Sequence, residues 1–194
     1  MPIRLADRVN NIQPSPTLAV TARAAELRAE GRDVIGLGAG EPDFPTPEPI
    51  RQAAREAIEA GHTHYTPVDG IAPLKEAIRE KFRRDNGLDY AADEVMVSCG
   101  GKQVVFNLAL ALLQAGDEVA IPAPYWVSYP DIAKIAGAAP IPIPASHEDD
   151  FKISAEQLDG ALNDNTRLFI LNSPSNPTGA VYHRGELEAL AEVL

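Results

Sequence analysis

Short apolar segments alternate with helix-length segments from Glu94 onward, and this rhythm limits the possible folds more than any other feature of the sequence. The apolar segments are expected to form strands at 95–98, 118–121, 140–143 and 168–171. Helices are expected at 102–114, 127–136, 154–162 and from about 184 to the end. Strands that alternate with helices favour a parallel sheet with helices on its faces. The sequence therefore predicts an α/β fold with a mostly parallel sheet and helices on both faces.

The first ninety residues show a different pattern, dominated by helices. Apolar spacing predicts helices over 17–30 and 49–60, and a third that begins near Leu74 and stops near Gly87. Only one short strand is expected here, at 34–37. The sheet is thus preceded by an N-terminal helical segment, and the change of rhythm near residue 90 marks a candidate boundary.

The charge of the chain narrows the range of partners. The formal net charge is -11 and the pI is about 4.8, and residues 91–194 hold 5 basic and 14 acidic residues. Nucleic-acid backbones and anionic membranes reward clustered Lys and Arg, so neither is expected as a partner. The N-terminal residues show no apolar signal core, and no run of 18 apolar residues occurs. A cytoplasmic protein is expected.

Cysteine and histidine usage excludes two kinds of structural site. Cys99 is the single cysteine, so an intramolecular disulfide is impossible. Four scattered histidines with one cysteine do not form a structural zinc cluster, and no metal site is expected. A reducing compartment is the simplest interpretation.

The first candidate site is a turn with two glycines, Gly100 and Gly101, between a predicted strand and a predicted helix. Free N–H groups at a helix N-terminus attract phosphate, and glycine lets the backbone approach a ligand. The turn is not a Walker A loop, since Met96 replaces its first glycine and Gln103 its Ser or Thr. The other interpretation is a plain turn between strand and helix.

Lys102 favours the phosphate interpretation of this turn. It is the only basic residue between Arg84 and Lys134, in a strongly acidic part of the chain. A single cation at the mouth of the turn suggests an anionic ligand. The alternative is a solvated surface lysine.

Two further loops follow predicted strands. Residues 122–130 hold three aromatic side chains, and the Trp126 ring could stack on a planar cofactor or pack in the core. Residues 172–179 hold Asn176 between prolines, which suits a directed hydrogen bond but also an ordinary turn. Because ligands bind beyond the carboxyl ends of parallel strands, the three loops can converge on one crevice.

These loops belong to five short segments that together resemble class I, fold type I aminotransferases, which use pyridoxal 5'-phosphate. The resemblance is to the aspartate aminotransferase branch and extends over nearly the whole chain. The matching segments are AGEPDF at 39–44, HYTPVDGI at 64–71, CGGKQ at 99–103, PYWVSYP at 124–130 and NSPSNPTGAVY at 172–182.

The resemblance implies roles for five residues at the cofactor. Gly100, Gly101 and Lys102 correspond to the turn whose backbone amides hold the cofactor phosphate. Trp126 resembles the ring that stacks on the pyridine, and Asn176 resembles the amide that bonds its phenolic oxygen. Trp126 and Asn176 are also expected beside the substrate.

The resemblance also implies substrate contacts and a homodimer. Tyr65 matches a tyrosine that reaches the cofactor phosphate of the neighbouring subunit, and Gly40 matches a glycine whose main chain touches the substrate carboxylate. In one bacterial subgroup, which includes enzymes that act on prephenate, residues at the positions of Lys102 and Thr17 contact the distal carboxylate of acidic substrates. Ser15 is expected to assist them.

The family comparison implies two parts. Residues 1–45 are expected to form an N-terminal arm and part of a small domain, and residues 46–194 part of the cofactor-binding large domain. The family's Schiff-base lysine, its pyridine-nitrogen aspartate and its carboxylate-binding arginine are expected beyond Leu194, with the rest of the fold. No catalytic residue is therefore assigned within the 194 residues, and the chain alone is expected to be inactive.

The expected function is transfer of the amino group between aspartate or glutamate and a 2-oxo acid, with small molecules as the substrates. Within the same class, an aromatic, alanine or prephenate aminotransferase is the alternative. A non-catalytic fragment or pseudoenzyme is a further possibility. A nucleotide-binding α/β module rests only on the Gly-Gly-Lys turn. The chain has neither a Walker A loop nor the dinucleotide fingerprint, since Glu41 occupies the place of the third glycine of that fingerprint.

Overall fold

The computed structural model describes residues 3–12, 14–38 and 40–194. Its contacts divide the chain into two compact units. We call them the sheet unit (Met1–Ala19 and Val105–Leu194) and the helical unit (Val20–Val104). Ala39, the first residue of the AGEPDF segment, lies outside the described residues.

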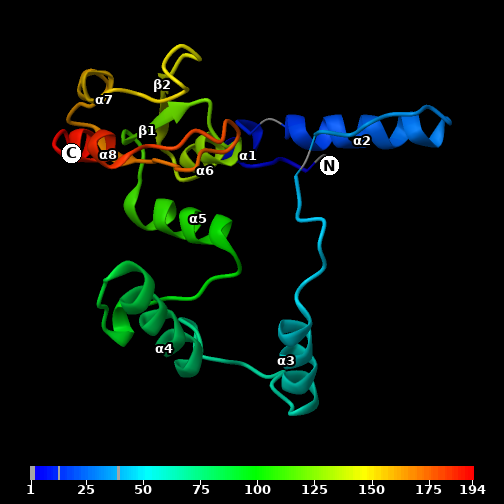
Figure 1. Ribbon diagram of the computed structural model, residues 1–194. Coiled ribbons are helices and arrows are strands. Elements are labelled where there is room, and N and C mark those ends of the chain that lie inside the picture. The colour runs from blue at the N-terminus through cyan, green and yellow to red at the C-terminus, as the bar shows by residue number, and fades with distance from the viewer. Residues whose placement is uncertain (1–2, 13, 39) are drawn as a thin grey trace. The chain divides into compact units, whose positions relative to one another are not determined.

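The sheet unit is built on three parallel strands (Figure 1). Strand β1 (Glu118–Ala123) lies in the middle, with β2 (Ala139–Pro144) on one side and β3 (Thr166–Phe169) on the other. The register of β1 against β3 shifts between Glu118 and Val119. The parallel sheet predicted from the rhythm of the sequence is confirmed.

Helices precede, connect and follow the strands of the sheet unit. They are α1 (Asp7–Asn10), the part of α5 (Gly101–Leu112) from Val105 on, α6 (Ser128–Ile135), α7 (Ala155–Ala161) and α8 (Arg184–Ala191). Helix α7 begins with a capping box, in which Ser154 Oγ accepts from Gln157 N at 3.2 Å and Ser154 N donates to Gln157 Oε1 at 2.8 Å. The predicted helices after residue 101 are therefore present.

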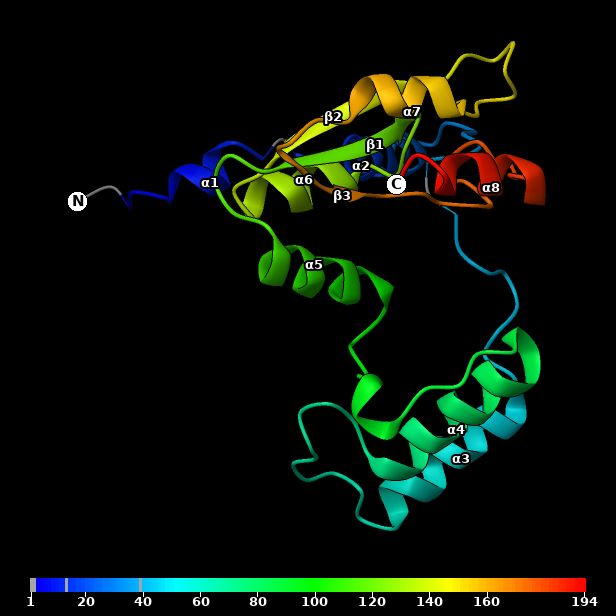
Figure 2. The same cartoon turned by 90° about the vertical axis from the view of Figure 1, so that its left-hand side faces the viewer.

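Both faces of the sheet are covered, because successive residues of β1 point to opposite sides. Val119 and Ile121 pack in one cluster with Ile132 of α6. Ala120 packs in the other cluster with Leu158 of α7. Figure 2 shows α6 and α7 against opposite faces. Burial of each large aliphatic side chain stabilises the fold by roughly 1.5–3 kcal/mol, so these two clusters hold the sheet unit together.

Strand β2 carries a proline at every second position: Pro140, Pro142 and Pro144. At its two ends, Ala139 N donates to Asp117 O and Ala145 N donates to Ala123 O, both at 2.9 Å. Alternate N–H groups of a strand point the same way, so the odd-numbered residues of β2 direct their N–H groups toward β1. The three proline nitrogens lie on the outer side.

The helical unit contains most of α2 (Pro16–Ala29), together with α3 (Glu48–Glu59) and α4 (Ala72–Lys81). These are the helices predicted from apolar spacing. A π-helical turn (Phe82–Asn86) extends α4 and ends at Gly87, whose φ of 66° is left-handed. A short 3-10 helix (Ala92–Glu94) follows, which the sequence pattern did not predict.

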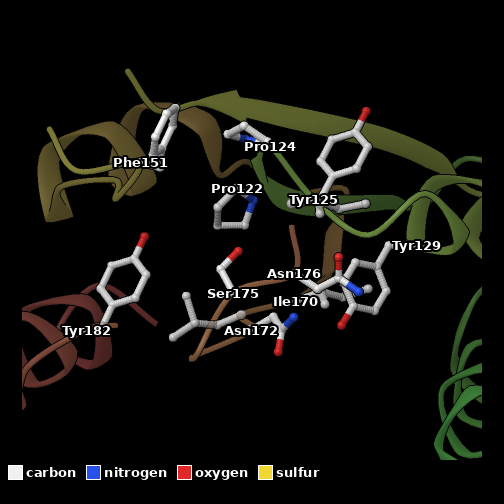
Figure 3. Close-up of a pocket in the computed structure, with 12 residues that line it drawn as sticks. Pro122, Pro124, Tyr125, Tyr129, Phe151, Ile170, Asn172, Ser175, Asn176 and Tyr182 are labelled. Carbon is white, nitrogen blue, oxygen red and sulfur yellow. The ribbon is translucent and has the colours of Figure 1, made fainter. Parts of the chain in front are cut away.

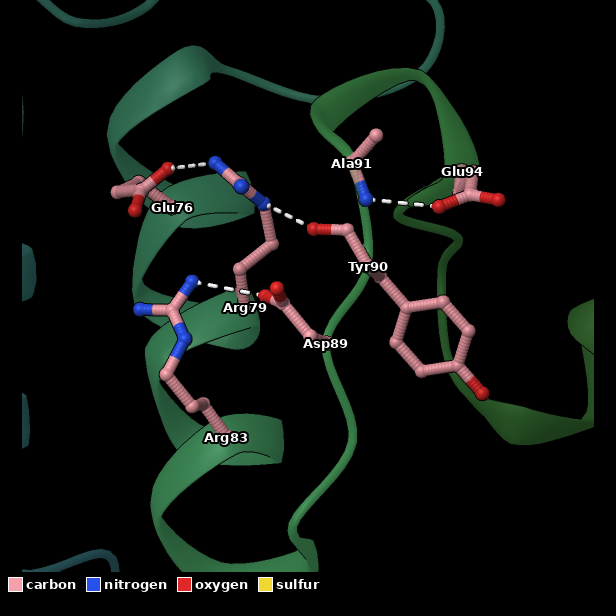
Figure 4. A network of polar contacts seen from close by, with 7 residues as sticks. All are labelled: Glu76, Arg79, Arg83, Asp89, Tyr90, Ala91 and Glu94. Atoms are coloured by element: carbon pink, nitrogen blue, oxygen red, sulfur yellow. Dashed lines mark hydrogen bonds and ion pairs between the residues drawn. The ribbon is translucent and has the colours of Figure 1, made fainter.

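Polar contacts tie the segment after this π-helical turn back to α4 (Figure 4). Arg79 Nε donates to Tyr90 O at 2.6 Å and its guanidinium pairs with Glu76 at 2.5 Å. One turn further along, Arg83 pairs with Asp89 at 2.9 Å. Since Glu76, Arg83 and Asp89 are exposed and Arg79 is only partly buried, each ion pair contributes little by itself, and the network fixes the path of the chain more than its stability.

Three strand predictions differ from the structure. Residues 34–37 and 95–98 have no regular secondary structure, and β3 covers 166–169 rather than 168–171. A strand requires a hydrogen-bonding neighbour along its length. Among the described residues, segment 95–98 has only an isolated bond of this kind, from Val97 N to Asp69 O at 3.0 Å. An apolar run alone therefore did not indicate whether a pairing partner exists.

Two other expectations concern boundaries and membranes. The division into an arm with part of a small domain (1–45) and part of a large domain (46–194) remains a prediction. None of the helices within the described ranges is both long enough and apolar enough to cross a membrane.

Candidate functional site

A pocket lies at the carboxyl ends of β1 and β3 in the sheet unit (Figure 3). Its walls come from the loops that follow these two strands and from the turn after β2. The lining residues are Ile121, Pro122, Pro124, Tyr125, Tyr129, Phe151, Ile170, Leu171, Asn172, Ser175, Asn176 and Tyr182. Two of the three loops predicted to converge on a crevice, 122–130 and 172–179, therefore meet at one pocket, at the edge where parallel sheets bind ligands.

Asn176 lines the pocket and lies in a loop closed by its own hydrogen bonds. With its amide oriented to satisfy both ends, Asn172 Nδ2 donates to Pro174 O at 3.3 Å and Asn172 Oδ1 accepts from Asn176 N at 3.0 Å. Ser175 N donates to Ala180 O at 2.9 Å. These bonds hold the backbone that carries the Asn176 side chain, an amide with both a donor and an acceptor group.

Proline peptide bonds shape both walls of the pocket. The bonds Ala123–Pro124, Ser173–Pro174 and Asn176–Pro177 are all cis. The sequence pattern identified the prolines but did not reveal these conformations.

Trp126 follows the first wall of the pocket but is not among the lining residues. Its half-buried ring meets Tyr129 edge to face, with centroids 5.2 Å apart and an interplanar angle of 86°. Tyr129 itself lines the pocket, and burial raises the pKa of its hydroxyl. Stacking of Trp126 on a cofactor ring remains a prediction.

Tyr182 is a pocket residue to which the sequence analysis assigned no role. The side chain is buried, and its hydroxyl accepts from Ile153 N at 2.8 Å. Burial raises the pKa of Tyr182, so the hydroxyl stays protonated at neutral pH. Tyr182 is the last residue of the NSPSNPTGAVY segment, which was the signal available in the sequence.

Phe151, on the third side of the pocket, lies outside both loops that the sequence pattern indicated. It has a φ of 56°, and Asp150 before it has a φ of 53°, so two consecutive non-glycine residues adopt the left-handed region. Phe151 N donates to Ser146 O at 2.8 Å, which closes the turn. No short sequence motif announces this conformation.

The turn with two glycines lies in the helical unit, at the start of α5. Gly100 has a φ of 90°, which a side chain would disfavour. A Cβ added to Gly100 or Gly101 would meet no heavy atom within 4 Å, so open space lies beside both residues. The backbone geometry therefore fits the predicted phosphate-holding turn, since the first N–H groups of a helix have no partner within the helix.

The predicted substrate residues are placed as follows. Gly40, the exposed Tyr65 and the exposed Lys102 lie in the helical unit. Ser15 and Thr17 are both partly buried and lie in the sheet unit, where Ser15 Oγ accepts from Leu18 N at 3.5 Å at the start of α2.

The structure thus places Asn176 in a pocket and Trp126 directly beside one of that pocket's walls. Assembly of these residues with those of the helical unit into a single site remains a prediction.

Comparisons with known proteins agree with this geometry. The family model "Aminotransferase class I and II" matches residues 32–194. An aspartate/prephenate aminotransferase of Cereibacter sphaeroides is 58% identical over 190 residues, which cover 98% of this chain and 48% of the relative. An aspartate aminotransferase of Bacillus sp. (strain YM-2) is 54% identical, and the match covers 97% of this chain and 48% of the relative. This chain spans about half the length of these relatives.

Solved structures show the same similarity. The aspartate aminotransferase from Rhizobium meliloti superposes with a TM-score of 0.95 and 49% identity, over 99% of this chain and 48% of that chain. The Thermus thermophilus aspartate aminotransferase with maleate superposes with a TM-score of 0.94 and 47% identity, over 98% of this chain and 50% of that chain. The family match, the sequence identities and these superpositions show together that the chain belongs to the class I and II aminotransferases.

Proposed function

We propose that this chain serves in transfer of an amino group between aspartate or glutamate and a 2-oxo acid, with pyridoxal 5'-phosphate as cofactor. The observation that carries the proposal is the pocket at the carboxyl ends of β1 and β3, with Asn176 on its wall. The names of the relatives, aspartate/prephenate and aspartate aminotransferase, support the reaction class.

The chain offers fitting groups for the cofactor in both units. The turn at Gly100, Gly101 and Lys102 would hold the phosphate through helix N-terminal amides and one cation. The Asn176 amide would donate to the phenolic oxygen, and Trp126 would cover the ring face. Pyridoxal phosphate, when bound, supplies the electron sink that amino-group transfer requires.

A dicarboxylic substrate is favoured by charge. Lys102 is the only basic residue between Arg84 and Lys134, and a second carboxylate would be attracted to it. The Thermus thermophilus protein was crystallised with maleate, a dicarboxylate. Thr17 and Ser15 would donate hydroxyl hydrogen bonds to the same carboxylate, and Gly40 would contact the other one through its main chain.

Prephenate is the second candidate substrate. Several similar proteins bear the name aspartate/prephenate aminotransferase, including those of Cereibacter sphaeroides and Nitrosomonas europaea. Prephenate also carries two carboxylates, so Lys102 would attract one of them in the same way.

We further propose a cytoplasmic homodimer in which the exposed Tyr65 reaches the phosphate site of the other copy.

Cofactor binding tests the proposal directly. Trp126 is the only tryptophan, so its fluorescence reports on the pocket during titration of the full chain with pyridoxal 5'-phosphate. Saturable quenching is expected, and Asn176→Ala should weaken binding about tenfold, the effect of one charge-assisted hydrogen bond. Asn107→Ala, an exposed position on α5, is the matched control and should bind like the native chain.

Substrate choice is tested by maleate in the cofactor-loaded protein. Lys102→Gln should reduce maleate affinity about tenfold or more, because it removes the charge but keeps a polar side chain that can donate a hydrogen bond. Quenching that does not saturate, or an Asn176→Ala chain that binds as the native one does, would contradict the assigned cofactor site.

A further inference from the structure

The Asn176 loop is fastened at its far end by Tyr182. This side chain is 6% exposed, and its hydroxyl accepts from Ile153 N at 2.8 Å. Ile153 lies on the segment that leads from β2 to α7, 29 positions earlier in the sequence, and is 4% exposed. One hydroxyl group therefore joins the loop after β3 to the segment after β2 inside the core.

The same residue also closes the loop through its backbone. Tyr182 N donates to Ser173 Oγ at 3.0 Å, which links the end of the loop to its beginning. Within the loop, Gly179 N donates to Ser175 O at 2.7 Å. The loop is thus a closed ring of bonds whose outer attachment is the Tyr182 hydroxyl.

We infer that Ser173 and Tyr182 are positioning residues that fix the Asn176 side chain in the pocket, by closing the loop that carries it and fastening that loop to Ile153. The inference rests on the proposed function for its consequence, in which Asn176 bonds the cofactor's phenolic oxygen. In this arrangement, Tyr182 and Ser173 act through the backbone and need make no bond to the cofactor.

The chemistry of the bonds explains why their loss would be felt at Asn176. Tyr182→Phe keeps the ring in the core cluster and removes only the oxygen, which leaves the Ile153 N–H buried without its acceptor. A buried donor that loses its partner is unfavourable, so the loop is expected to move until water reaches that group. Ser173→Ala opens the ring at its other end, whereas Ser173→Thr retains the hydroxyl.

Hydrogen exchange of the full chain without cofactor tests the inference. The Asn176 N–H donates to Asn172 Oδ1, so its exchange rate reports closure of the loop. Tyr182→Phe and Ser173→Ala should each accelerate this exchange about tenfold, and Ser173→Thr should restore it to within about twofold. Tyr90→Phe, in the helical unit, is the matched control and should leave the rate unchanged.

The cofactor readout separates this inference from the proposed function. Tyr182→Phe and Ser173→Ala should weaken pyridoxal 5'-phosphate binding about fivefold, and neither should add to the effect of Asn176→Ala in a double variant. Native exchange at Asn176 in both Tyr182→Phe and Ser173→Ala would overturn the inference, whatever the cofactor affinity. Accelerated exchange with unaltered affinity in Asn176→Ala would support loop positioning and reject the proposed role of Asn176. If Tyr182→Phe does not fold, the Ser173→Ala and Ser173→Thr pair decides.

Discussion

The sheet unit and the helical unit are stabilised in different ways. The sheet unit buries two apolar clusters, one on each face of β1. Among the described residues of the helical unit, the only buried ones are Val95 and Lys75, while large apolar side chains such as Ile35, Ile58 and Val68 are exposed. A sheet provides helices with a common apolar surface, whereas α3 and α4 share no such layer. The helical unit therefore depends more on hydrogen bonds, ion pairs and backbone conformation.

Lys75 illustrates the second mode of stabilisation. This nearly buried cation pairs with Asp69, whose backbone oxygen accepts from Val97 N at 3.0 Å. The pair thus links α4, the HYTPVDGI segment and the segment that precedes the Gly100 turn. In this region one ion pair holds separate segments together, whereas in the sheet unit a cluster of aliphatic side chains does so.

The largest effect is expected from core truncation in the sheet unit. Leu158 is 0% exposed, so Leu158→Ala should lower the free energy of unfolding by about 2–5 kcal/mol. Leu74 in α4 is 43% exposed, and Leu74→Ala should cost about 1 kcal/mol or less. Urea unfolding monitored by circular dichroism measures both. Equal losses would mean that the contrast in burial does not govern stability.

A backbone substitution should rank second and act on the helical unit. Gly70 has a φ of 106°, and an added Cβ would lie 2.6 Å from Val97 Cγ2. Gly70→Ala should therefore destabilise this region by about 1–3 kcal/mol and accelerate exchange of the Val97 N–H. Gly61→Ala, with a φ of 78° but open space around it, is the control for backbone strain alone and should cost less. Similar effects of the two would show that the Val97 contact yields easily.

Acid should weaken the helical unit through Asp69. The hydrogen bond from Lys75 lowers the pKa of the Asp69 carboxyl below its ordinary value. This pair therefore stabilises the fold above the unfolded-state pKa, and the contribution is lost as the pH falls through the folded-state pKa. Protection of the Val97 N–H, relative to an unfolded chain, should decline between about pH 5 and pH 2. Asp69→Asn should flatten that decline, and an unchanged profile in this variant would exclude Asp69 as its source.

The smallest effect is expected at the surface of the sheet unit. Arg184 has a side chain that is 89% exposed and lies 3.4 Å from Glu188, one helical turn away. Arg184→Ala should change the free energy of unfolding by less than about 0.5 kcal/mol, and added salt should reduce even that. A loss above about 1 kcal/mol would show that surface ion pairs matter more in α8 than their exposure implies.

Local sequence signals predicted most of the elements, because apolar spacing and caps act within a few residues. The helices expected at 127–136 and 154–162, which the structure forms as α6 and α7, are clear cases. Strand pairing depends on distant residues, which explains why 34–37 and 95–98 were predicted wrongly. Segment 95–98 contacts Asp69 rather than a strand, and nothing in its own residues encodes that.

The site shows the same division between local and distant information. Asn176 was predicted from its loop, because the prolines and the segment NSPSNPTGAVY surround it directly. The part played by Tyr182 depends on Ile153, 29 positions away, and Phe151 owes its place to a left-handed turn. Trp126 meets Tyr129 edge to face, a contact that could not be read from spacing, and its stacking on a cofactor ring stays a prediction.

The alternating prolines of β2 determine at which edge of the sheet a further strand can pair. A strand that joined the outer side of β2 would need N–H donors at positions 140, 142 and 144, and proline has none. That border therefore cannot template another strand, from this protein or from a neighbour in a crowded cell. Any extension of the sheet must begin at β3, whose outer N–H and C=O groups are not blocked in this way. Three residues without an amide hydrogen thus set both the end of the sheet and its protection against edge-to-edge aggregation.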